Sequence, residues 1–122
     1  MNAAKKPAQS RILLPQLLSN PASANSLEWQ PFRPGVEIVR IYGDSAGGAS
    51  SALLRYAAGA TVPRHEHAGY EHILILSGSQ TDENATYRAG DLLVNPPGSS
   101  HSIRSDDGCL ALAIWERGVV FE

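Results

Sequence analysis

From residue 36 onward the chain alternates short runs of β-branched and apolar residues with clusters of turn residues. Such runs, with turn signals about every eight to twelve residues, are typical of β-sandwiches and β-barrels. No segment of this part shows convincing helical periodicity, so the pattern predicts an all-β body. The runs predicted as strands are 36–42, 51–56, 71–76, 91–94, 110–115 and 119–121, with shorter pieces near 61–67, 86–87 and 102–104.

The first 35 residues differ from the rest of the chain in charge and in proline content. They hold four Lys and Arg against one acidic residue (+3), and five of the eight prolines. The remainder holds six Arg and no Lys against eleven acidic residues (−5). At 122 residues the chain has room for one domain. We therefore interpret 1–35 as an N-terminal arm that packs on the domain, and 36–122 as the folded body.

Composition excludes several classes of protein. A single Cys cannot form an intramolecular disulfide or a cysteine-cluster zinc domain. The apolar runs are far shorter than the ~20 residues of a membrane-spanning helix, and a net charge of −2 offers no basic surface for nucleic acid. The run 12–18, after two lysines, faintly imitates a signal peptide, but Pro15 and Gln16 interrupt it. We expect a cytoplasmic protein with no membrane or nucleic-acid partner.

Three residues of metal-binding type lie close together in the sequence: His65, His67 and Glu71. Residues i and i+2 of a strand share a face, so both imidazoles project to the same side. If a hairpin follows, Glu71 begins the next strand within reach of them. His101 comes just after an Asn-Pro-Pro-Gly turn, whose prolines restrict the backbone. Imidazole and carboxylate suit a divalent transition metal, although a hydrogen-bonded polar core without metal is the alternative.

These residues resemble the two motifs of the cupin superfamily (RmlC-like proteins), position by position. The first motif, G(X)5HXH(X)3-4E(X)6G, is matched from Gly59 to Gly78. The second, G(X)5PXG(X)2H(X)3N, is matched from Gly90, with Ser105 in place of the final Asn. The resemblance implies that 36–122 forms a single cupin-type β-barrel, a double-stranded β-helix or jelly roll. It also implies that the two histidines of the first motif, its glutamate and His101 bind one metal ion.

A narrower resemblance is to the cupin domain of ChrR-type anti-sigma factors, on residues 53–67, 95–101 and 108–110. In that family the cupin half binds a metal and takes part in sensing oxidative stress. A separate N-terminal helical domain, with its own His/Cys zinc site, binds the sigma factor. Residues 1–35 are too short for that domain and contain neither His nor Cys. The resemblance, which covers roughly 36–115, implies a stand-alone ChrR-like cupin.

Other residues carry weaker hypotheses. His72 follows Glu71 directly, so on a strand it faces the opposite way and is expected at the surface or an interface. Cys109 lies in an apolar run and is expected to be a small buried side chain. A redox role for it is implied only by the ChrR resemblance, and the chain offers no second thiol. Residues that can line a pocket, or simply pack, are Arg55, Tyr56, Tyr70 and Trp115.

A site of three His and one Glu leaves coordination positions open, whereas structural zinc is usually fully ligated by protein. One Zn, Fe, Mn or Ni ion per chain can polarise a small oxygen-bearing substrate and, as iron, react with O2. The resemblance favours dioxygenase-type chemistry on a dicarbonyl or hydroxyketone. The second hypothesis is a ChrR-like, metal-dependent sensor or ligand-binding module without catalysis. A third is a metal of only structural value.

The alternation along 71–76 also bears on assembly. Ile73 and Ile75 share the face of Glu71 and are expected in the interior. Leu74 and Leu76 then point outward and need a cover. Either the arm or a second subunit can supply it, and we expect a homodimer.

Overall fold

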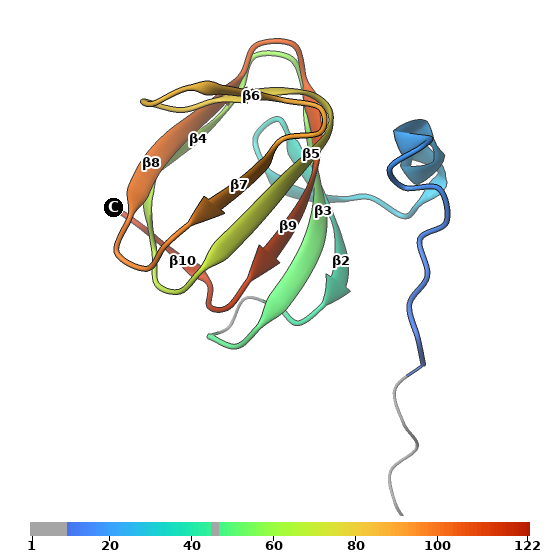
Figure 1. The fold of residues 1–122 in the computed structure, drawn as a ribbon, viewed down its shortest axis with the longest axis horizontal. Coiled ribbons are helices and arrows are strands. Elements are labelled where there is room, and N and C mark those ends of the chain that lie inside the picture. Colours follow the sequence, from blue (N-terminus) through green and yellow to red (C-terminus); the bar gives the residue numbers. More distant parts are fainter. Residues whose placement is uncertain (1–9, 45–46) are drawn as a thin grey trace, which may run out of the picture.

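The computed structural model describes residues 10–44 and 47–122, and Figure 1 shows their strands curled beside a short arm. The first nine residues of the predicted arm lie outside the described residues. No helix in the described part is long and apolar enough to cross a membrane. The elements are η1 (Pro21–Ser26), β1 (Gln30–Arg33), β2 (Val36–Tyr42), β3 (Ser50–Tyr56), β4 (Ala60–His67), β5 (Glu71–Thr81), β6 (Thr86–Arg88), β7 (Leu92–Asn95), β8 (Ser100–Ser105), β9 (Cys109–Trp115) and β10 (Val119–Phe121).

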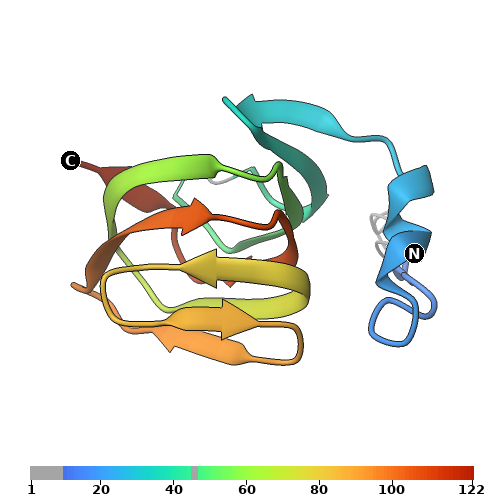
Figure 2. The ribbon, with the colours of Figure 1, turned by 90° about the horizontal axis from the view of Figure 1, so that it is seen from above.

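The strands form two antiparallel sheets that share β5. The first half of β5 lies between β7 and β9, where Glu71 pairs with both Asn95 and Trp115. Its second half pairs with β6 and, through Thr81 and Arg104, with β8. Seen from above in Figure 2, the sheets curl around a common interior. This architecture confirms the predicted all-β, cupin-type barrel with a short N-terminal arm.

β5 continues past the point where the sequence predicts its end. Ser-Gly-Ser at 77–79 predicts a turn, yet the strand runs to Thr81 with a bulge just before Gly78. Gly78 has φ of +73°, and a Cβ there would overlap the carbonyl of Gly108. Glycine thus lets the strand bend from one sheet into the other, so the expected turn is a kink inside a long strand.

The interior of the barrel is filled by alternate residues of the strands. Ile73 and Ile75 are buried there, as the face of Glu71 predicts. His72 lies on the opposite face of β5, where it pairs with Val94 and Ile114, two residues with exposed side chains. The remaining interior cluster includes Val36, Ile38, Leu54, Val62, Ile103 and Trp115.

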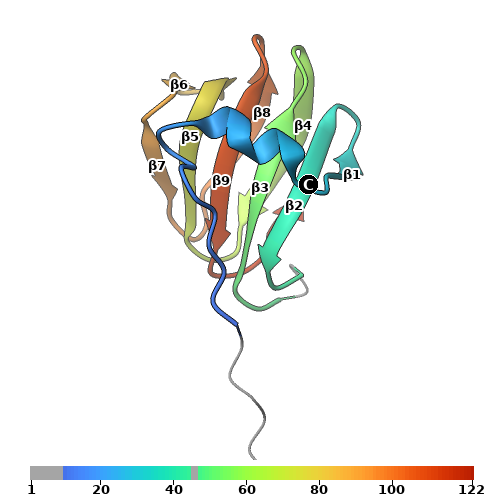
Figure 3. The ribbon, with the colours of Figure 1, turned by 90° about the vertical axis from the view of Figure 1, so that its right-hand side faces the viewer.

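The arm lies across the outer face of the sheet that contains β3, β9 and the first half of β5 (Figure 3). Leu14, Leu17 and Ala24 pack there against a cluster that includes Leu53 and Leu76. The arm therefore supplies the cover that the sequence predicts for Leu76. β1 pairs with β2 and extends this sheet; the boundary at residue 35 stays a prediction.

β1 and β10 stand at opposite ends of the sheet order β1-β2-β3-β9-β5-β8-β4-β10. Among the described residues β1 pairs only with β2, and β10 only with β4. The two sheet edges are instead bridged by side chains, because the guanidinium of Arg33 lies 4.0 Å from the ring centroid of Phe121. We call this junction, formed by Phe32, Arg33, Val119 and Phe121, the seam.

Candidate metal centre

β4 and β8 bring three histidines together inside the barrel. His65 and His67 come from β4, and His101 of β8 pairs directly with His65. Their side chains are buried, with residue exposures of 3%, 1% and 4%. One nitrogen from each ring lies within 4.8 Å of the other two. The strand spacing that predicts a common face for His65 and His67 therefore produces a three-imidazole cluster.

The outer nitrogen of each ring has a hydrogen-bond acceptor. These contacts are His65 Nδ1 to Pro63 O at 2.9 Å, His67 Nδ1 to Ser99 Oγ at 2.9 Å, and His101 Nδ1 to Asp82 Oδ2 at 3.0 Å. The Ser99 hydroxyl donates its own proton to Pro96 O at 2.6 Å, so it accepts from His67. This network assigns the proton to Nδ1 in every ring and leaves each Nε2 with its lone pair.

Two of the three Nε2 atoms lack a hydrogen-bond partner. Nε2 of His67 and of His101 are buried and have no hydrogen-bond partner. Such atoms are costly in a protein interior unless something satisfies them. Burial also lowers the pKa of His65, which favours the neutral ring that binds metals. Three neutral imidazoles with lone pairs toward a common space fit a divalent transition-metal ion.

Glu71 lies beside this cluster at the head of β5. Its Oε1 is 3.0 Å from His67 Nε2 and accepts a hydrogen bond from Asn95 Nδ2 at 2.9 Å, while Oε2 accepts one from Trp115 Nε1 at 2.6 Å. Burial by itself raises the pKa of Glu71, but the nearby His67 ring and the hydrogen bonds from Trp115 and Asn95 hold that pKa below its ordinary value. With the proton of His67 on Nδ1, two lone pairs face each other at 3.0 Å, an arrangement that calls for a proton or a cation.

The turn before β8 is attached to His67. The Gly98 N–H donates to His67 O, and the His67 N–H donates to Ser99 O, both at 2.8 Å. Gly98 adopts φ of +86°, which glycine tolerates without strain. The rigid turn predicted before His101 is therefore hydrogen-bonded to the backbone of His67, and it leads directly into β8, the strand that carries His101. Ser105, which replaces the motif's Asn, donates to Ser79 O at 2.7 Å and ties β8 to β5.

Sequence reasoning missed three residues that hold the centre. The sequence marks Asn95 and Ser99 only as part of the turn before His101, and it gives no signal for Asp82. They contact Glu71, His67 and His101 across 24, 32 and 19 positions of the chain, respectively. No local spacing signals such contacts, because strand pairing creates them.

A small cavity lies next to His65 and Glu71, with a volume of about 50 Å³. Of the predicted pocket residues, Tyr56 and Trp115 line it. Three seam residues, Phe32, Val119 and Phe121, also line it, and the ring of Phe121 lies 5.5 Å from that of His65. Its apolar walls include Phe32, Leu54, Val62, Ile73, Val119 and Phe121.

The other two predicted pocket residues lie elsewhere. Arg55 neighbours Tyr56 on β3 and so faces outward, where it stacks on Trp29 at 4.2 Å and pairs with Glu37 at 2.9 Å. Tyr70 is half exposed at the turn before β5, and its N–H donates to the carboxylate of Glu116.

Cys109 is buried, and burial raises the pKa of its thiol to about 12. Thiol chemistry proceeds through the thiolate, so this environment opposes reactivity at neutral pH.

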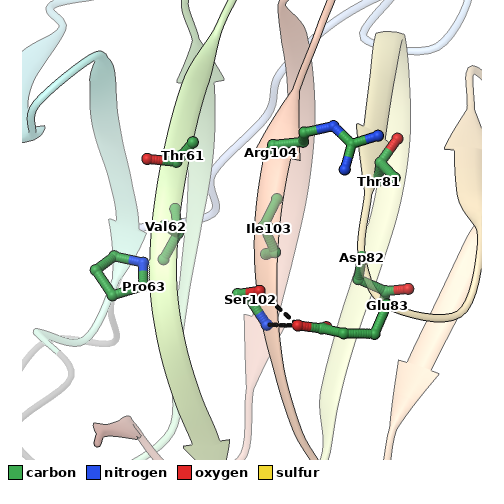
Figure 4. A pocket seen from close by; sticks show the side chains of 9 residues that line it. All are labelled: Thr61, Val62, Pro63, Thr81, Asp82, Glu83, Ser102, Ile103 and Arg104. Atoms are coloured by element: carbon green, nitrogen blue, oxygen red, sulfur yellow. Dashed lines mark hydrogen bonds between the residues drawn. The ribbon is translucent and has the colours of Figure 1, made fainter.

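A larger groove of about 360 Å³ runs over the outside of β4 and β8 (Figure 4). The Glu83 carboxylate there accepts hydrogen bonds from the backbone N–H and the hydroxyl of Ser102. Thr61 and Arg104 also line it. None of the three clustered histidines lines it, but Asp82, whose carboxylate contacts His101, does.

Comparison with known proteins places this geometry in a family. The sequence model of the ChrR Cupin-like domain matches residues 21–115. A comparison with curated proteins finds no significant match. Among solved structures, the chain resembles a protein of unknown function with a cupin-like fold from Ralstonia eutropha JMP134, at 24% identity and a TM-score of 0.62, over 67% of this chain and 55% of that one.

It also resembles a chain of the complex of Rhodobacter sphaeroides SigE with the anti-sigma ChrR, at 23% identity and a TM-score of 0.65, over 92% of this chain and 70% of that one. A third similar structure is a putative acetylacetone dioxygenase from Methylibium petroleiphilum PM1, at 13% identity and a TM-score of 0.78, over 98% and 85%. The chain thus spans little more than half the length of the Ralstonia protein. Because the family model covers most of its residues, the chain belongs to the ChrR Cupin-like domain family.

Proposed function

We propose that this chain is a small metal-dependent cupin enzyme. His65, His67 and His101, with Glu71 as the fourth ligand, hold one Zn, Fe, Mn or Ni ion beside the cavity. The observation that carries the proposal is the pair of buried Nε2 atoms that face the cluster without a hydrogen-bond partner. Such an ion supplies a Lewis acid for a substrate oxygen and, as Fe(II), a site for O2 chemistry.

The cavity argues for a small, uncharged, oxygen-bearing substrate. One buried water needs about 10–15 Å³ of such space, so a cavity of about 50 Å³ takes a ligand with few non-hydrogen atoms. Its walls are mainly apolar, and the Glu71 carboxylate beside it opposes an anion. Burial, followed by the charge of Glu71, raises the pKa of Tyr56, which keeps that hydroxyl protonated and able to donate to a substrate oxygen.

Dioxygenase-type chemistry on a small carbonyl compound is the favoured reaction. The similarity in fold to a putative acetylacetone dioxygenase supports it. So does the open coordination that three or four protein ligands leave at a transition metal.

The second candidate is a metal-dependent sensor or ligand-binding module without catalysis. The family match and the similarity to the SigE–ChrR complex favour it. In that case the same cavity binds a small molecule or oxidant, and the protein reports its occupancy to a partner.

Metal analysis tests the site. Purified wild-type protein is expected to hold one equivalent of metal per chain, and His101→Ala is expected to lose it. His72→Ala is the matched control, because His72 lies on the outer face of β5. Full metal content in His101→Ala contradicts the assignment, as does equal loss in both variants.

Oxygen uptake separates the enzyme from the sensor. The apoprotein is loaded anaerobically with Fe(II) and mixed with O2 and acetylacetone or other small ketones and hydroxyketones. Turnover that His101→Ala abolishes supports the enzyme. Tight, saturable binding of a carbonyl compound without O2 uptake supports the sensor instead.

We further propose a homodimer formed through an outer apolar patch of Leu74, Leu92, Val94, Leu112 and Ile114. Leu92, Val94 and Ile114 are 61%, 43% and 40% exposed. The five side chains lie on neighbouring positions of β7, β5 and β9, and Leu74 and Leu112 also pack against the cluster that the arm covers. β7 pairs only with β5 in the described chain, so its other edge is available to a second copy.

We also propose a cytoplasmic location, with a small molecule and a second copy as partners rather than nucleic acid or a membrane. The single free thiol, Cys109, suits a reducing compartment. The net negative charge opposes nucleic-acid binding.

A further inference from the structure

One of the three clustered histidines has a different outer partner from the other two. The Nδ1 atoms of His65 and His67 face a carbonyl and a hydroxyl, whereas His101 Nδ1 lies 3.0 Å from the carboxylate of Asp82. Both side chains of the His101–Asp82 pair are almost fully buried, at 5% and 4% exposure. A charged acceptor forms a stronger and more directional hydrogen bond than a neutral one.

Asp82 is itself held in place by the turn between β5 and β6. Its Oδ1 accepts the N–H groups of Asn84 and Ala85 at 2.9 and 3.1 Å, and the hydroxyl of Tyr87 at 3.0 Å. The Tyr87 hydroxyl also lies 3.1 Å from Oδ2, the oxygen that faces His101. The carboxylate is therefore oriented before any ligand binds, with its own hydrogen-bonding capacity largely used.

A carboxylate that accepts from Nδ1 keeps the proton on that nitrogen and makes Nε2 a stronger electron donor. In His101, Nε2 is the buried atom without a partner. The contact thus determines both where the ring points and which nitrogen is available to a metal.

We propose that Asp82 is a positioning residue, which holds His101 in the Nδ1-protonated tautomer with Nε2 directed at the space shared with His65 and His67. The effect on the tautomer depends only on the contact described. The consequence for metal affinity rests on the proposed metal site.

The next residue, Glu83, provides a matched control. Its carboxylate also binds β8 from the same turn, but it accepts from the backbone N–H and hydroxyl of Ser102 on the outer surface (Figure 4). Glu83→Gln therefore weakens an attachment of the turn to β8 without touching a histidine of the cluster.

The first test is the histidine ring spectrum of the metal-free protein, from two-bond 1H–15N correlation NMR. Wild type and Glu83→Gln are expected to show His101 with the proton on Nδ1. In Asp82→Asn the amide can offer either an oxygen or an NH2 group, so the Nε2-protonated form is expected to appear. An Nε2-protonated His101 in the wild type overturns the proposal, even if Asp82→Asn does not fold.

The second test is the affinity for Zn(II), measured by competition with a chelator at constant pH. Asp82→Asn is expected to bind about 10–100-fold more weakly than wild type. Glu83→Gln is expected within about twofold, and Asp82→Glu, which restores a carboxylate, is expected between the two. Equal losses in Asp82→Asn and Glu83→Gln mean that Asp82 only stabilises the turn, which contradicts the proposal. A wild type that binds no Zn(II) refutes the metal site but leaves the tautomer result standing.

Discussion

The indole Nε1 of Trp115 donates a 2.6 Å hydrogen bond to Oε2 of Glu71, across the ladder that pairs β9 with β5. On the other side of β5, Asn95 of β7 donates to Oε1. The two strands that flank β5 therefore hold one carboxylate oxygen each. Glu71 is fixed beside His67 by the sheet itself, before any ligand arrives.

Trp115→Phe removes this donor and leaves Oε2 of a buried carboxylate unsatisfied. We expect a loss of about 1–3 kcal/mol in the free energy of unfolding, measured in urea. Trp29→Phe is the matched control, because its indole donates to Ala24 O at 2.9 Å outside the barrel, where water can replace it. Equal losses in the two variants would show that ring size, and not the hydrogen bond to Glu71, dominates.

Gly78→Ala is expected to destabilise the protein more than Gly90→Ala. Both glycines have positive φ, +73° and +94°, so both substitutions carry a backbone cost of roughly 1 kcal/mol. A Cβ at Gly78 also overlaps the Gly108 carbonyl, whereas nothing lies within 4 Å of one at Gly90. Thermal unfolding of both variants measures the difference. If the two variants had similar melting temperatures, the close approach of the Gly108 carbonyl would not be the reason that residue 78 is glycine.

Cys109 is expected to be inert to alkylation in the folded protein at pH 8. Burial raises its thiol pKa from an ordinary 9.0 to about 12, so the thiolate that reacts is nearly absent until the pH approaches that value. Iodoacetamide labelling followed by mass spectrometry should be slow in buffer and fast in urea. Rapid labelling of folded protein would instead favour the redox role implied by the ChrR resemblance.

Phe121→Ala is expected to expose the proposed metal centre. The ring lies between Arg33, at 4.0 Å, and His65, at 5.5 Å, and it lines the cavity at the seam. Its removal should accelerate loss of bound metal to a chelator several-fold. Val120→Ala, one residue earlier and 55% exposed, should leave that rate unchanged. Unchanged rates in both variants would mean that access does not pass through the seam.

Leu92→Glu is expected to convert the proposed homodimer to a monomer, because it places a charge on the most exposed side chain of the outer apolar patch. Val120→Glu adds the same charge on β10, which β8 and β4 separate from β5, and should leave the dimer intact. Light scattering at micromolar concentration distinguishes the two states. A wild type that is monomeric under those conditions would refute the dimer directly.

The strand content, the shared face of His65 and His67, and the turn before His101 could all be predicted from the sequence. These features depend on residues close together in the chain: the two-residue period of a strand and the restricted backbone of Pro-Pro-Gly. The same local reasoning failed at Ser77–Ser79. From local sequence, Gly78 predicts the end of a strand. The structural reason for the glycine is the close approach of the Gly108 carbonyl, thirty positions later in the chain.

By itself, then, the sequence determined which residue types line up on one strand face and which motif they form. Only the tertiary structure decided what lies behind each imidazole and around Glu71. Asp82 meets His101 across 19 positions, and Trp115 meets Glu71 across 44, because particular strands pair in a particular register. The seam of Arg33 and Phe121 likewise joins the two ends of the sheet. Local spacing says nothing about such contacts, since the curl of the whole barrel brings them together.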